Sequence, residues 1–265
     1  MKKALKILAV ALLLAATVVP AQAQRRVVHY LPKYEQEPYH FGFLLAFNEM
    51  MYTIKTVEDY QNIRLEPSTW PDEGNASTEF YNVYNIETQQ RPGFTVGIIG
   101  SKRLGRYFDL RFIPSLSFCD RQLTYNIVAT DINGNPTIKD PLKKYIFTTF
   151  VEFPLNIKYR SKRYNNIGAY LMGGVNPKLD LSSNKQSYDP NTGKVKNFVT
   201  KRFDMAAEIG VGFDFYNQWF KMGLEVKMSY GMLDVVKNSN KAGLIYTAPI
   251  DQLRNKMFQV SMLFE

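Results

Sequence analysis

The sequence has little of what metal centres, disulfide frameworks and imidazole catalysis require. Its 265 residues include 1 Cys and 2 His. A single cysteine excludes a disulfide framework and a cysteine-rich zinc site, and two histidines leave little room for a histidine-rich metal site. Hydrophobic residues make up 45% of the chain and charged residues 22%, which excludes disorder throughout. Aromatic residues are abundant, with 17 Tyr and 18 Phe beside only 2 Trp, and this composition favours a fold built from strands.

The first 23 residues are expected to be a secretory signal peptide. Lys2, Lys3 and Lys6 accompany an apolar stretch from Leu5 to Val19, and Ala21-Gln22-Ala23 fits the small-x-small rule for cleavage. An uncleaved anchor helix is the weaker alternative, because the stretch is shorter than the about 20 residues that span a bilayer. Residues 24–38 would then be a periplasmic leader and residues 39–265 an outer-membrane β-barrel domain.

Removal of the three lysines of the signal peptide lowers the formal net charge from +9 to +6. This modest excess does not indicate a nucleic-acid partner, least of all for an exported protein. No segment after the signal peptide is apolar enough for a transmembrane helix. A mature protein that enters a membrane must therefore do so as strands.

Alternation of apolar and polar residues predicts an all-β fold, an eight-stranded antiparallel up-and-down transmembrane β-barrel. In the sixth expected strand, for example, Ile209, Val211 and Phe213 lie on one face, while Glu208 and Asp214 lie on the other. The expected strands cover residues 39–53, 92–101, 107–128, 143–160, 163–177, 200–216, 219–235 and 255–264.

Alternation alone does not say which face is inside, since a soluble lipocalin-like carrier buries its apolar face and an outer-membrane barrel shows it to lipid. The connections favour lipid, because those after the second, fourth and sixth strands are short and the others long, as expected for short periplasmic turns and long extracellular loops. The export signal and the small residues on the polar face also favour an outer-membrane barrel. So does an aromatic girdle expected at the short-turn end, formed by Tyr39, Tyr107, Tyr159, Tyr164, Tyr216 and Trp219. The sequence therefore predicts a protein of the cell outer membrane, in contact with lipid and lipopolysaccharide.

The hairpin around Asn217-Gln218 gives a sharper prediction for the interior. A register that matches opposite charges places Asp214 opposite Lys221 and Glu208 opposite Lys227. Such pairs are expected because a single unpaired charge in a narrow lumen is costly. Eight strands enclose a lumen that side chains just fill, so a conducting pore is not expected. The other charges expected in the lumen are Asp109, Arg111, Glu152, Lys158 and Glu225.

The longest connection, residues 54–91, is the main candidate for an interaction site. Its aromatic residues Trp70, Phe80, Tyr81 and Tyr84 are candidates for contact with a partner. The alternative is a loop that packs over the barrel mouth and has no partner. Both interpretations remain open from the sequence.

No catalytic residue, metal site or cofactor is expected. His29 lies in the leader and His40 at the inner end of the first strand, away from the outer rim where lipid-modifying barrels carry out their chemistry. No G-x-S-x-G or H-E-x-x-H motif occurs, and Glu152 and Glu208 are interpreted as paired lumen charges. Cys119 is expected to be a buried free thiol. The sequence predicts a protein that is not an enzyme and has no small-molecule substrate, with a lipid-modifying enzyme as an alternative.

Three segments resemble the PorT family, also called SprT in gliding bacteria. They are PYHFGFLLAFNEMMYTIK at 38–55, FTTFVEFPLNIKYRSKR at 147–163 and GAYLMGGVNPKLDL at 168–181. The resemblance implies a Bacteroidetes outer-membrane component of the type IX secretion system, with other components of that system as partners. The family carries no accepted catalytic residues. Together with the filled lumen, the resemblance predicts an accessory or assembly role rather than the conducting pore. A structural or adhesion barrel that binds partners through its long loops is the alternative. One departure is that Phe264 is followed by Glu265, whereas barrel assembly signals usually end on the aromatic residue.

Overall fold

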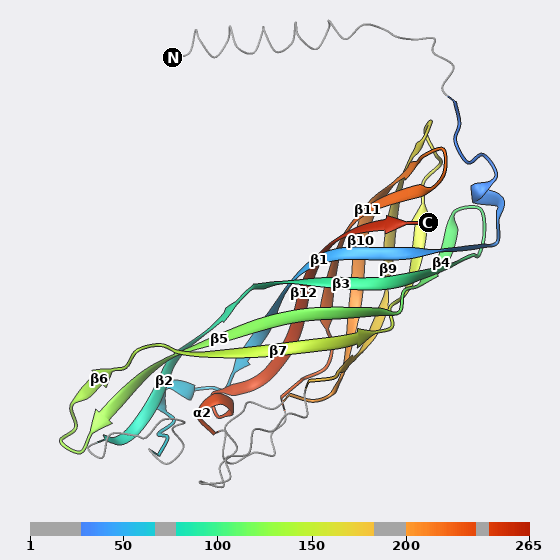
Figure 1. Ribbon diagram of the computed structural model, residues 1–265. Helices are drawn as coiled ribbons and strands as arrows, with labels where there is room; N and C mark the ends of the chain where they lie inside the picture. Colours follow the sequence, from blue (N-terminus) through green and yellow to red (C-terminus); the bar gives the residue numbers. More distant parts are fainter. Residues whose placement is uncertain (1–27, 67–77, 183–199, 237–243) are drawn as a thin grey trace, which may run out of the picture.

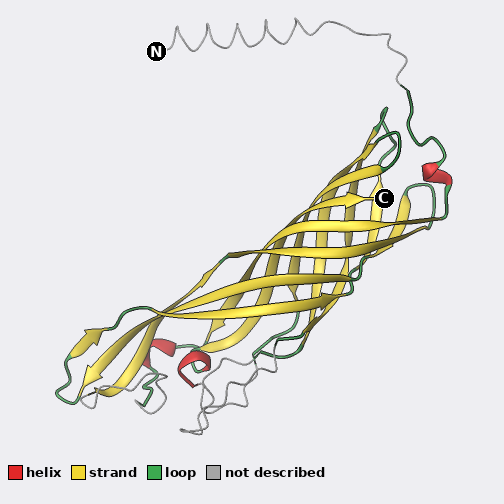
Figure 2. Cartoon of the chain, in the orientation of Figure 1, coloured by secondary structure: helices red, strands yellow, loops and turns green. Residues whose placement is uncertain are grey.

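The computed structural model describes residues 28–66, 78–182, 200–236 and 244–265. The expected signal peptide and Trp70 lie outside the described residues. Most of the regular structure is strand (Figure 2). The strands are β1 (Tyr39–Thr56), β2 (Thr78–Gln89), β3 (Arg91–Arg103), β4 (Phe108–Phe112), β5 (Ser115–Asp131), β6 (Pro136–Ile138), β7 (Leu142–Glu152), β8 (Leu155–Arg160), β9 (Ile167–Asp180), β10 (Phe203–Tyr216), β11 (Lys221–Gly231) and β12 (Ile250–Phe264).

Three short helical segments complete the described structure: η1 (Tyr34–Gln36), η2 (Tyr60–Asn62) and α2 (Leu244–Thr247). None of the helices in the described ranges is long and apolar enough to cross a membrane.

The strands pair in a closed circuit, and all of their pairings are antiparallel. Around the circuit, β9 pairs with β10, and β11, β12, β1 and β3 follow in turn. β3 then pairs with both β4 and β5, which pair with β8 and β7, and these two return to β9. The strands run as a long tilted bundle around a common interior (Figure 1). The short turns and the leader lie at one end, and β2, β6 and α2 lie at the other (Figure 1).

The sheet contains twelve strand elements rather than eight uninterrupted strands. Two expected strands, 107–128 and 143–160, are each divided at a proline, Pro114 and Pro154. Proline has no N–H to donate to a ladder, and the two breaks adjoin, because the N–H of Ile113 donates to the carbonyl of Pro154 at 3.2 Å. The remaining two elements, β2 and β6, lie in connections for which the alternation pattern predicts no strand, and both pair with β5.

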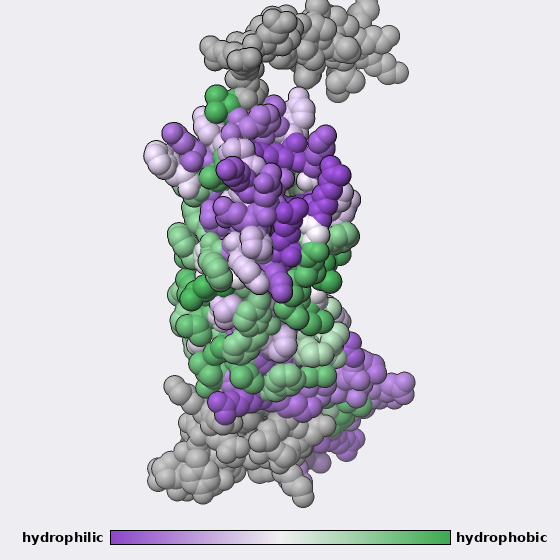
Figure 3. Space-filling view, turned by 90° about the vertical axis from the view of Figure 1, so that its right-hand side faces the viewer, coloured by the Kyte–Doolittle hydropathy of each residue, from purple (hydrophilic) through white to green (hydrophobic). Residues whose placement is uncertain are grey.

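Apolar side chains cover the outside of the bundle. Phe41 is 73% exposed, Phe147 70% and Ile209 68%, and on the face drawn in Figure 3 a band of hydrophobic surface crosses the middle of the molecule between more polar regions. Exposure of such a large apolar surface to water is unfavourable, whereas contact with the hydrocarbon region of a bilayer is favourable. This is the apolar-outward arrangement that the strand pattern favours.

The interior alternates between polar and apolar layers. Two small apolar clusters lie within the strands: one contains Leu44 and Leu263, and the other contains Met50, Cys119 and Phe150. Cys119 is a buried free thiol, as expected. A larger apolar cluster fills the end away from the leader and consists of Tyr52, Leu65, Tyr81, Val83, Leu123, Tyr125, Ile127, Ala129, Val235, Val236, Tyr246, Ile250 and Leu253.

Gly174 allows β9 to approach β8 closely at the level of the polar layer. A Cβ atom on Gly174 would collide with the carbonyl oxygen of Leu155 and with the side chain of Asn156. Both collisions involve atoms held by the ladder or by buried hydrogen bonds. Only a residue without a side chain therefore fits at this position.

We expect Gly174→Ala to lower the free energy of unfolding by about 1–3 kcal/mol, because the added methyl group overpacks the β8–β9 contact. Urea unfolding of the detergent-solubilised protein measures the effect. The matched control is Gly105→Ala, since a Cβ on Gly105 meets nothing within 4 Å. Equal stability of the two variants would contradict the close approach at Gly174.

Candidate functional site

The interior next to the short turns is a buried network of ion pairs. Arg111, on β4, lies 3.1 Å from Glu225 on β11 and 3.1 Å from Glu265. Glu265 also forms an ion pair with Lys221, and the hydroxyl of Tyr170 donates to Glu225 at 2.8 Å. All of these groups are buried, so each charge depends on its partners for the stabilisation that water would otherwise give.

The predicted partner of Asp214 is wrong. The ammonium of Lys158 lies 2.6 Å from the Asp214 carboxylate, and Lys221 pairs with Glu265 instead. The cause is the strand register, in which Tyr216 faces Lys221 and Asp214 faces Gly223. The predicted register placed the turn at Asn217-Gln218, whereas the N–H of Asn217 donates to the carbonyl oxygen of Phe220 at 2.9 Å, so that Gln218 and Trp219 form the turn. The register moves by an even number, so every side chain stays on its predicted face.

A second polar layer lies farther from the leader. Glu208 and Lys227 form an ion pair of 3.2 Å, as predicted, although the residue directly opposite Glu208 is Ser229. Asn176 donates to Glu208 at 2.7 Å and to Glu152 at 2.9 Å. The network thus joins strands β7, β9, β10 and β11 across the interior.

Several members of the network were absent from the sequence prediction. Lys178 lies 3.3 Å from Glu152, Arg160 lies 3.3 Å from Asp109, and Arg121 donates to Asn255 at 2.5 Å. The alternation of the strands carried a signal for Lys178 and Arg160, which lie on the same face as Asn176 and Lys158. Their partners lie on neighbouring strands, β7 for Lys178 and β4 for Arg160, so the strand pairing and its register identify them.

The candidate interaction residues of the long connection differ in accessibility. Tyr81 is buried within the large apolar cluster and is not available to a partner, which corrects its assignment. Phe80 is half-buried, with the guanidinium of Arg64 4.7 Å from its ring centroid, and Tyr84 is 40% exposed. Tyr81 and Val83 face the buried side of β2, whereas Tyr84 lies at a register shift between Val83 and Asn85 and points outward.

The leader packs against the short-turn end of the interior. The hydroxyl of Tyr34 donates to Glu265 at 2.9 Å, and the ammonium of Lys221 lies 4.7 Å from the centre of the Tyr34 ring. Burial, together with the adjacent Glu265 carboxylate, raises the pKa of Tyr34 well above its ordinary value. The ring of His40 stacks on Tyr34 with centroids 4.0 Å apart. These contacts close the interior at the short-turn end.

Tyr216 belongs to this seal and not to the aromatic girdle. It is buried, and its hydroxyl donates to Glu35 at 3.2 Å. The guanidinium of Arg163 lies 3.9 Å from the centre of its ring. The other five expected girdle residues have exposed side chains, which are Tyr39, Tyr107, Tyr159, Tyr164 and Trp219.

Comparison with known proteins agrees with this architecture. Residues 21–237 match the family described as outer membrane protein beta-barrel domain. The chain belongs to this family. The family and the apolar outer surface assign the protein to the outer membrane.

Two solved structures show a distant likeness. OprG, an outer membrane protein from Pseudomonas aeruginosa, is 10% identical, with 86% of this chain and 96% of OprG covered at a TM-score of 0.38. The outer membrane protease OmpT from Escherichia coli is 9% identical, with 90% of this chain and 98% of OmpT covered at a TM-score of 0.36. No curated protein matches the sequence.

We expect Glu265→Gln to lower the free energy of unfolding by about 3–5 kcal/mol, because it removes the negative charge shared by buried Arg111 and Lys221. Urea unfolding in detergent measures the change. The control is Asp251→Asn, which breaks an exposed pair of 2.8 Å with Lys55 and is expected to cost about 0–1 kcal/mol. A loss at Glu265 no larger than at Asp251 would show that the interior is hydrated.

Proposed function

We propose that this protein is a non-enzymatic outer-membrane component required for type IX secretion. It acts as an accessory or assembly factor rather than as the conducting pore. In this proposal the membrane-spanning unit is an eight-stranded barrel, in which β4 with β5 and β7 with β8 each count as one crossing. The observation that carries the proposal is the filled interior, from the Tyr34 seal through two layers of ion pairs to the large apolar cluster.

Passage of an exported protein through this interior is disfavoured on energetic grounds. Opening it requires the separation of buried pairs such as Arg111–Glu225 and Lys158–Asp214, and each separation costs about 3–5 kcal/mol. The activity is therefore assigned to surfaces: the leader, the connections at the opposite end and the lipid-facing band. Contacts with other secretion components and with lipopolysaccharide belong to the same proposal.

Two features support the PorT-like assignment and the absence of catalysis. The segments that resemble that family, 38–55, 147–163 and 168–181, form β1, β7 with β8, and β9, so they are parts of the barrel wall. Both histidines lie at the leader end: His29 lines a pocket there, and the Nε2–H of His40 donates to the carbonyl oxygen of Tyr34 at 2.8 Å. A lipid-modifying site at the opposite rim would need other residues.

A structural or adhesion barrel is the second candidate, and the projecting β2, β5 and β6 elements favour it (Figure 1). Tyr84 gives this projection an exposed aromatic side chain. Under this alternative the loops bind a partner and secretion is independent of the protein.

The test is deletion of the protein followed by complementation. We expect the deletion strain to retain type IX cargo inside the cell, and the wild-type chain to restore delivery and processing at the surface. Affinity purification from solubilised outer membrane is expected to recover other components of the machinery. The measurement is cargo in the surface and culture fractions.

The loop variant Phe80→Ser/Tyr84→Ser separates the two candidates. Normal cargo delivery by the deletion strain would remove the secretion role. If the loop variant abolishes surface binding while secretion stays normal, the adhesion barrel replaces it. Migration of the unheated protein in a gel checks that each variant is folded.

A further inference from the structure

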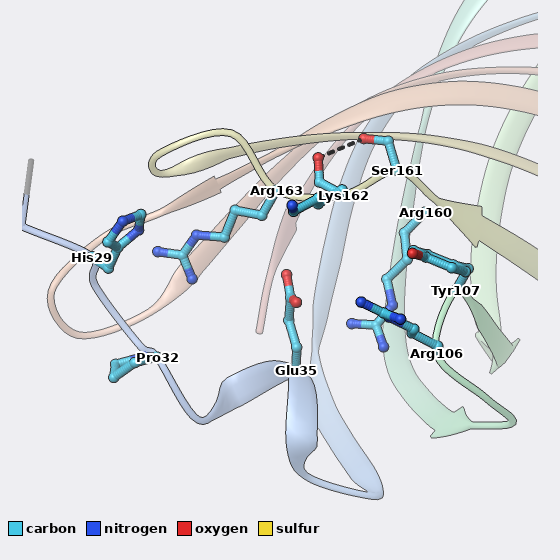
Figure 4. A pocket seen from close by; sticks show the side chains of 9 residues that line it. All are labelled: His29, Pro32, Glu35, Arg106, Tyr107, Arg160, Ser161, Lys162 and Arg163. Atoms are coloured by element: carbon cyan, nitrogen blue, oxygen red, sulfur yellow. Dashed lines mark hydrogen bonds between the residues drawn. The ribbon is translucent and has the colours of Figure 1, made fainter.

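A basic pocket of about 470 Å³ lies between the leader and the short turns. Its lining residues are His29, Pro32, Glu35, Arg106, Tyr107, Arg160, Ser161, Lys162 and Arg163 (Figure 4). Four of these side chains are positively charged at neutral pH and one is negatively charged. The pocket is of the size that small ligands and headgroups occupy.

Two of the four cations have no acidic partner among the described residues, although the guanidinium of Arg106 lies 5.4 Å from the centre of the Tyr107 ring. Arg160 pairs with Asp109 at 3.3 Å, and Arg163 binds the carbonyl oxygens of Tyr30 and Asn165. Arg106 and Lys162 are exposed, and neither has an acidic partner within ion-pair distance among the described residues. The single acid of the lining, Glu35, accepts a hydrogen bond from Tyr216. An excess of free positive charge therefore faces the pocket.

An apolar groove begins where the basic pocket ends. It has a volume of about 300 Å³ and shares Ser161 with the basic pocket. The groove runs over the outer face of β8, β9 and β10, because Ala169 is small and the larger residues Tyr159, Leu171 and Phe213 flank it. Tyr107 and Tyr159, one from each site, have ring centroids 6.4 Å apart. The basic pocket and the apolar groove are therefore two adjoining parts of one surface, one charged and one apolar.

We propose that this surface binds a glycerophospholipid of the periplasmic leaflet. The phosphodiester lies between Arg106 and Lys162, and one acyl chain lies in the groove at Ala169. Three observations carry the assignment. Free cations match a phosphate, the groove continues into the hydrophobic band, and the short-turn end is the periplasmic end of such barrels.

An acidic peptide satisfies the charges but not the groove, which descends along the lipid-facing surface. The pocket also involves the leader, through His29, Pro32 and Glu35. A bound lipid therefore contacts the segment that seals the interior as well as the two turns.

The test is native mass spectrometry of the full mature chain in detergent, titrated with phosphatidylglycerol. We expect one lipid to bind, and Arg106→Ala/Lys162→Ala to weaken binding about a hundredfold, about tenfold for each charge-assisted contact. Ala169→Phe, which fills the groove, is expected to weaken binding about tenfold. The matched controls are Arg64→Ala/Lys143→Ala, which removes two exposed charges at the opposite end, and Val175→Phe on the same face of β9.

Three results would overturn the proposal. The first is equal lipid affinity in the wild type and the Arg106/Lys162 variant. The second is that inorganic phosphate, at the concentration of the lipid, displaces the lipid while Ala169→Phe leaves the lipid affinity unchanged. This result would make the pocket a site for a soluble anion. The third is capture of a poly-glutamate peptide in preference to the lipid, again independent of Ala169, which would make it a protein-docking site.

Discussion

The structure depends on ion pairs in its interior, where buried charged side chains are out of reach of both water and lipid and must neutralise one another. Arg111 illustrates the constraint: it lies between Glu225 and Glu265, and Glu265 also holds Lys221. Arg111 comes from β4 and both Lys221 and Glu225 from β11, so the ion pairs of Arg111 form only when distant parts of the chain come together. The apolar outer band follows from the same alternation, since every residue that places a charge inside places its neighbour against lipid.

The leader extends this constraint beyond the strands. Tyr34 donates to Glu265 and stacks on His40, so the segment before β1 completes the polar layer at the short-turn end. At the other end the large apolar cluster closes the interior without charges. The two ends are closed by different chemistry, and the surfaces left for function are consequently the outside of the leader, the projecting connections and the lipid-facing band.

Much of this architecture can be predicted from the sequence, because period-two alternation reports directly on which face a residue occupies. The polar face of β10 and β11, which carries Glu208 and Lys227, follows from it. Alternation does not predict which side chains pair across the interior. Lys158 and Asp214 lie on β8 and β10, which do not follow each other in the sequence, and only the folded structure brings them together. The position of the turn at Gln218-Trp219 decides the register of the β10–β11 hairpin. The strand breaks at Pro114 and Pro154 could be predicted, because proline has no N–H to donate to a strand ladder. Tyr216 was misplaced because an aromatic residue near a strand end suits either a girdle or a seal, and Tyr81 because β2 lies in a connection that was not expected to form a strand.

The orientation of the two faces is the central claim, and quenching by brominated lipid acyl chains tests it directly. Single tryptophans at Phe213, Leu224 or Phe150, in a chain whose Trp70 and Trp219 are replaced by Phe, report on the two sides of the wall. Phe213 is 50% exposed and Leu224 44%, whereas Phe150 is 2% exposed. The account predicts strong quenching at positions 213 and 224 and little at 150. Strong quenching at 150 with protection at 213 and 224 would contradict it.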